Sequence, residues 1–119
     1  MLKERLGLAQ IHGVKALAEP TVEFRQHLLR GVLQLQQVDG EQAAEASFQR
    51  VIALAREQEA KLMELRATVH LARLWRTQGK SQEARQMLAE LYGWFSEGFD
   101  SVDLREAKAL LEQLQVAGA

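Results

Sequence analysis

Residues 62–91 read LMELRATVHLARLWRTQGKSQEARQMLAEL, and the expected fold of the whole chain follows from them. Apolar residues recur every three or four positions on both sides of Gly79, a pattern typical of two amphipathic helices joined by a glycine turn. Ser81 is predicted to cap the second helix. Small Ala72 and Ala84 stand where the two helices would approach most closely. Because a single hairpin cannot bury both of its apolar faces, we expect further hairpins on either side.

The flanking sequence predicts four more helices of similar length. Pro20 and Gly40 mark the clearest breaks between them. The six expected helices cover residues 2–17, 22–37, 41–58, 61–78, 82–95 and 101–116. Gly40 and Gly79 lie 39 positions apart, a period near that of an α-solenoid built from stacked helix pairs. We therefore expect one all-α domain over residues 1–119, an α-α superhelix with antiparallel hairpins over about 2–37, 41–78 and 82–116.

The helix expected over 61–78 carries two apolar stripes. One consists of Leu65, Val69, Ala72 and Trp75, and the other of Ala67, Leu71 and Leu74. Two stripes predict two packing partners and place this helix in the middle of the stack.

Composition limits the cellular setting. The chain is 47% hydrophobic and 26% charged, with one proline and no cysteine. Without cysteine it has neither disulfides nor thiolate metal ligands, so we expect a cytoplasmic location. No apolar run reaches the roughly 18 residues that cross a bilayer, so no membrane association is predicted. The net charge of -1 provides no bulk attraction for nucleic acid.

The central hairpin resembles the tetratricopeptide repeat. In that family the first helix carries a bulky residue, a leucine, a small residue and an aromatic residue, and here Thr68, Leu71, Ala72 and Trp75 follow in that order and spacing. The family's second helix has an alanine followed four positions later by a large apolar residue, as in Ala84 with Leu88 and Ala44 with Phe48. Thr68 replaces the usual large residue, and the proline that ends a repeat is absent.

A longer resemblance covers residues 30–114. It includes AEASFQRVIALAR, ELRATVHLARLWRTQGKSQEAR and YGWFSEGFDSVDLREAKALL. This series is similar to the C-terminal repeat region of large bacterial regulators, in which a nucleotide cyclase or other signalling domain is joined to a P-loop ATPase. The resemblance implies a non-catalytic segment of a signalling protein. No G-x-x-x-x-G-K-[ST] loop is present, so neither activity is carried over to this chain.

The resemblance to tetratricopeptide repeats also implies a binding groove, because the first helix of each pair lines the concave face in that family. The residues at the corresponding groove positions are Arg66, Val69, Arg73, Arg76 and Thr77. A row of guanidinium groups suits a carboxylate-bearing peptide or an acidic helix. The alternative is a solvated face that keeps the protein soluble. Arg25, Gln36 and Gln37 would extend the same surface.

No metal, cofactor or catalytic site is predicted. The candidates for metal or acid–base chemistry are His12, His27 and His70. Glu23 lies one helical turn before His27, but the sequence has no H-E-x-x-H or E-x-x-H pattern to complete a metal shell. The serines lack a G-x-S-x-G context and are interpreted as caps and surface residues.

The large aromatic residues gather late in the chain, at Trp75, Tyr92, Trp94, Phe95 and Phe99. Their concentration predicts a core between the last hairpin and the closing helix, with Trp94 the member expected outside it.

These observations favour a non-catalytic protein–protein interaction or scaffolding module, of which the regulatory tail of a signalling ATPase is one form. Two alternatives stay open: a regulatory domain that binds a small-molecule effector, and a purely structural dimerisation unit. The helix expected over 2–17 lacks an obviously polar outer face, so we also expect it to pack on another copy of the chain, giving a homodimer, or on another domain.

Overall fold

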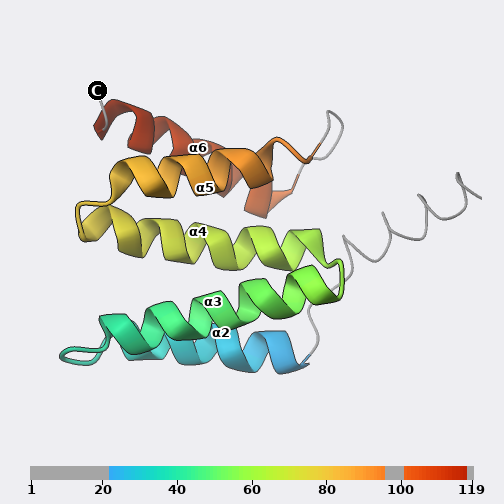
Figure 1. Cartoon of the computed structure of the whole chain (residues 1–119), viewed down its shortest axis with the longest axis vertical. Coiled ribbons are helices and arrows are strands. Elements are labelled where there is room, and N and C mark those ends of the chain that lie inside the picture. The colour runs from blue at the N-terminus through green and yellow to red at the C-terminus, as the bar shows by residue number, and fades with distance from the viewer. Residues whose placement is uncertain (1–21, 96–100, 118–119) are drawn as a thin grey trace, which may run out of the picture.

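The computed structural model describes residues 22–95 and 101–117, and within these ranges the chain is all-helical (Figure 1). Its helices are α2 (Val22–Leu35), α3 (Glu41–Glu57), α4 (Lys61–Thr77), α5 (Ser81–Tyr92) and α6 (Val102–Ala117). Each begins within one residue of its predicted start and ends within three of its predicted end. The first predicted helix, over 2–17, lies outside the described residues. None of the described helices combines the length and apolar character needed to span a membrane.

Short turns join the first four of these helices, and Gly40 and Gly79 lie in two of the turns, as the sequence predicts. Gly79 has a φ of +81°, in the left-handed region that suits glycine. The backbone N–H of Lys80 donates to the carbonyl of Trp75 at 2.8 Å and closes the turn. The predicted cap at Ser81 is wrong: Lys80 occupies the N-cap position, without a side-chain cap, and Ser81 is already helical. Ser101 does cap its helix, because its hydroxyl accepts the N–H of Leu104 at 3.2 Å.

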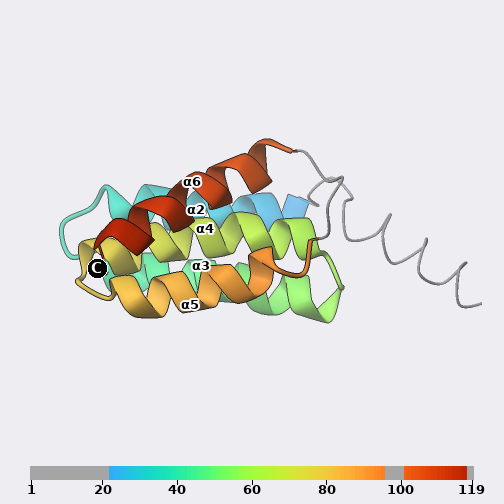
Figure 2. The same ribbon diagram turned by 90° about the horizontal axis from the view of Figure 1, so that it is seen from above.

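Consecutive helices pack against one another, and α4 also contacts α6. Figure 1 shows α2 and α3 at one end of the stack, α4 in the middle and α6 at the other end. Seen from above, α2, α4 and α6 lie toward one side and α3 and α5 toward the other (Figure 2). Among the described helices, the 61–78 helix therefore has three packing partners, α3, α5 and α6, one more than its two apolar stripes predict, and it lies in the middle of the stack as expected.

The core divides into two clusters that meet on α4. One cluster joins α2, α3 and α4 and includes Phe48, Val51 and Leu71. The other joins α4, α5 and α6 and includes Leu65, Leu88 and Leu114. As expected, the two stripes of α4 divide between the clusters, and Trp75 packs against both.

Gly31 sets the distance between α2 and α3. A Cβ atom at this position would lie 2.5 Å from Cε1 of Phe48, closer than non-bonded carbon atoms approach. Phe48 is completely buried, so its ring has little room to move away. The absence of a side chain at Gly31 is therefore what allows the two helices to pack this closely.

Most of the predicted aromatic core is confirmed among the described residues. Phe95 is buried, Tyr92 is partly buried, and both belong to the cluster around α5 and α6. The indole N–H of Trp75 donates to Glu45 Oε1 at 3.0 Å. Trp94 is 46% exposed, as expected, and meets Phe95 edge-on with ring centroids 5.0 Å apart. Phe99 lies outside the described residues.

Candidate functional site

The three arginines of the predicted groove row contact α6. Arg66 binds Asp103 through two hydrogen bonds, Nε to Oδ1 at 3.1 Å and Nη2 to Oδ2 at 2.9 Å. Arg73 Nη2 lies 3.7 Å from Glu106 Oε2. Arg76 donates from Nη1 to Gln113 Oε1 at 2.7 Å. The contacts follow the same order along both helices, so α4 and α6 run parallel.

The other two members of the row have local roles. Val69 is 3% exposed and belongs to the core cluster shared with α6. Thr77 donates its hydroxyl to the carbonyl of Leu74 at 2.7 Å, in the last turn of its own helix. The row therefore packs against α6. We call the contact between this row and α6 the α4–α6 seam. Binding of an outside partner there stays a prediction, and such a partner would share the arginines with α6 or displace it.

His70 is half-buried at this seam, where its ring stacks on Phe48 with centroids 5.3 Å apart and an interplanar angle of 16°. Burial lowers the pKa of His70 below 6.5, and the positive charges of Arg73 and Arg66 lower it further, while Glu106 and Asp103 act in the opposite direction. The imidazole is therefore neutral near pH 7. Its place in the structure is that of a packing residue.

Glu64 is a buried carboxylate, 3% exposed, in the first turn of α4. Arg56 Nε lies 2.9 Å from its Oε2, and Lys61 Nζ lies 3.3 Å from its Oε1. Lys61 also lies 5.6 Å from the ring centroid of Trp94. With both oxygens paired, Glu64 links the end of α3 to the start of α4.

The histidines are not gathered into a metal site in the part of the chain that the structure describes. His27 lies on α2 and His70 on α4, while His12 is outside the described residues. Across 22–95 and 101–115, no three or more histidine, aspartate or glutamate side chains lie close enough together to hold one ion.

A surface that the sequence analysis missed lies on the first described hairpin. Val22, Leu29 and Leu33 of α2 are 69%, 58% and 50% exposed. Their spacing of seven and four residues aligns them along one face of the helix. We call this face, together with the adjoining hollow between α2 and α3, the outer α2–α3 surface.

The hollow has a volume of about 370 Å³. Its lining consists of His27, Arg30, Gln34, Ala43, Ala46, Ser47 and Arg50. On its floor the hydroxyl of Ser47 donates to Gln34 Oε1 at 2.7 Å. None of the three stripe residues lines the hollow, but Arg30 at its edge is three residues before Leu33, so the stripe and the hollow are neighbours on the surface of α2.

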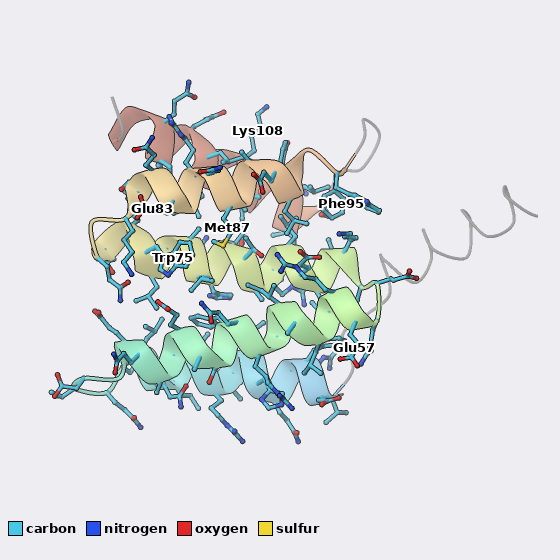
Figure 3. The ribbon with its side chains drawn as sticks, in the orientation of Figure 1. Glu57, Trp75, Glu83, Met87, Phe95 and Lys108 are labelled. Carbon is cyan, nitrogen blue, oxygen red and sulfur yellow. The ribbon has the colours of Figure 1, made fainter. Side chains whose placement is uncertain are left out.

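Two other hollows lie elsewhere on the stack. One, of about 520 Å³, lies between α5 and α6 and is lined by three glutamines together with Arg85, Ala89 and Leu111. The other, of about 300 Å³, has Trp75 and Met87 in its wall, and Figure 3 shows these two side chains close together between α4 and α5. Neither adjoins an exposed apolar stripe.

Comparisons with protein-family models, with curated proteins and with solved structures found no match to this chain.

Proposed function

We propose that this chain is a non-catalytic protein–protein interaction module that binds a helix of its partner on the outer α2–α3 surface. The observation that carries the proposal is the exposed apolar stripe of Val22, Leu29 and Leu33. Apolar side chains aligned on one helix face form the kind of patch that an amphipathic helix covers.

The stripe alone supports only weak binding. Full burial of a leucine or valine side chain contributes about 1.5–3 kcal/mol, and these three are already partly covered. Together they would contribute roughly 3–4 kcal/mol, whereas a micromolar complex needs about 8 kcal/mol. The hollow and its polar groups therefore have to supply much of the remaining affinity.

We also propose that the described hairpins are successive units of a tetratricopeptide-like stack. Three-residue connections, 58–60 and 78–80, join α3 to α4 and α4 to α5, and α4 contacts α6 two helices further along the chain. Parallel contact between alternate helices is what repeated hairpins produce. In such a stack the outer α2–α3 surface is the face on which another helix would be added.

The test is to weaken the apolar stripe without changing the fold. A Leu29→Gln, Leu33→Gln double variant and the wild type would be titrated with a labelled synthetic amphipathic helix whose flanking positions are all glutamine, followed by fluorescence anisotropy. We expect the double variant to lose at least about tenfold in affinity, because the two leucines are the central members of the stripe. A Val102→Gln variant serves as the matched control, since Val102 is 61% exposed on α6.

Equal affinity of the double variant and the wild type would refute the proposal. Sedimentation of the same samples addresses the alternative of a dimerisation unit. If the double variant converts a wild-type dimer to a monomer, the stripe binds a second copy of the chain and a separate partner is not needed.

A further inference from the structure

We infer that the helix bound on the outer α2–α3 surface is acidic, with glutamate or aspartate residues beside its apolar stripe that pair with Arg30 and Arg50. The inference rests on the proposed function and names the chemistry of the partner.

The charge of the hollow is one-sided. Arg30 and Arg50 are among its lining residues, and no carboxylate is. Within residues 22–95 and 101–115, neither Arg30 nor Arg50 takes part in an ion pair, whereas Arg56, Arg66 and Arg73 each have a carboxylate partner. Two guanidinium groups without a carboxylate at one hollow form a site for the carboxylates of another molecule.

The remaining polar groups of the hollow do not compete for this role. Ser47 is buried, and its hydroxyl is already bonded to the side-chain oxygen of Gln34. Small Ala43 and Ala46 line the same hollow and allow a helix backbone to approach closely. The open hydrogen-bonding capacity of the lining therefore lies mainly on Arg30 and Arg50, which come from different helices.

The chain already binds one helix of this kind to itself. In the α4–α6 seam, α6 buries apolar side chains such as Leu104 and Leu110 while Asp103 and Glu106 lie against Arg66 and Arg73. The outer α2–α3 surface offers the same two features, an apolar stripe and adjacent arginines. An acidic amphipathic helix is thus the occupant that its chemistry fits.

Charge argues against the two occupants that the chain itself could provide. The segment before α2 carries Lys3, Arg5 and Lys15 against Glu4 and Glu19, so it brings more cations than acids to a cationic hollow. In a symmetric dimer formed through this surface, a second copy would bring its own Arg30 and Arg50 to the same interface. Like charges facing each other disfavour both arrangements relative to an acidic partner.

The experiment uses three synthetic helices with one shared apolar stripe and with glutamate, glutamine or lysine at the flanking positions. Each is titrated against the full chain and an Arg30→Glu, Arg50→Glu variant. A Lys108→Glu variant is the control, because Lys108 is an exposed cation on α6 (Figure 3). Affinities come from fluorescence anisotropy at low and high salt, with circular dichroism to verify the fold of each variant.

We expect the wild type to bind the glutamate helix at least about tenfold more tightly than the glutamine helix, with the difference shrinking at high salt. The charge-reversed variant should prefer the lysine helix, while the Lys108 control should behave as the wild type does. If the glutamate and glutamine helices bind the wild type equally, the acidic partner is refuted and the interaction module stands. If none of the three binds, the proposed function itself fails.

Discussion

Replacing Gly31 by alanine should destabilise the protein, although the same change in an exposed helix interior stabilises it. Alanine has a helix propensity about 1 kcal/mol more favourable than glycine. Here the added Cβ would lie 2.5, 2.8 and 3.0 Å from three atoms of the Phe48 ring. Phe48 is fully buried and stacks on His70, so α2 and α3 would have to separate or the ring leave its preferred rotamer.

Overpacking of this kind costs about 1–3 kcal/mol, and it can reach the upper part of that range where a buried ring is trapped. Subtracting the gain in helix propensity leaves a net loss of roughly 1–2 kcal/mol in the free energy of unfolding. The assay is urea unfolding followed by far-ultraviolet circular dichroism. The matched control is Gly93→Ala, because a Cβ at Gly93 meets its nearest atom at 3.4 Å, an ordinary contact.

The expected result is a lower unfolding midpoint for Gly31→Ala and little change for Gly93→Ala. If Gly31→Ala instead raises the free energy of unfolding by about the propensity difference, the close packing of α2 on Phe48 is wrong. That result would also remove the support for the position of the outer α2–α3 surface.

Three further changes test the rest of the stack. Leu88→Ala should lower the free energy of unfolding by about 2–5 kcal/mol, because Leu88 is completely buried; exposed Glu90→Ala is its control in the same urea assay. A double-mutant cycle of Arg66→Gln with Asp103→Asn should give a coupling of roughly 1 kcal/mol that falls with added salt, and zero coupling would contradict the two-bond pairing. The pKa of His70 is lowered in the folded state. As the pH falls below 6.5, the unfolded chain therefore binds a proton at this residue before the folded chain does. The free energy of unfolding decreases in that pH range as a result. The stability difference between wild type and His70→Gln should therefore shrink as the pH falls from 7.5 to 5, and a difference independent of pH would refute the assignment.

The helices of the described region could be predicted because their signals are local. Apolar spacing and the glycines at positions 40 and 79 predicted the bounds of the five described helices closely. The double stripe on 61–78 correctly indicated a central helix. The cap at Ser81 failed for a local reason as well. The turn closes on backbone groups, through Lys80 N–H and the Trp75 carbonyl, so the helix starts without a side-chain cap.

The surroundings of the arginine row on α4 were harder to predict because they depend on tertiary contacts. The arginines of α4 can be identified in the sequence. Only the packing of the helices shows that α6 lies against them, with Asp103 and Glu106 as partners. Val69 already indicated this packing, since an apolar residue within a row of arginines favours a buried contact with another helix over an open groove.

The apolar half of the outer α2–α3 surface could have been found from the sequence. Leu29 and Leu33 form a second apolar stripe on the 22–37 helix, by the same reasoning that detected two stripes on 61–78. The cationic half could not, because Arg30 and Arg50 lie on different helices and meet at one hollow only after α2 packs on α3.

The most direct measurement is a titration of the isotopically labelled full chain with the glutamate-flanked helix, followed residue by residue through backbone amide chemical shifts. Our expectation is that the largest changes lie on α2 and α3, around Leu29, Arg30 and Arg50, with little change at Arg73 and Arg76. Changes concentrated along the α4–α6 seam would contradict it, and would move the binding site to the arginine row of α4.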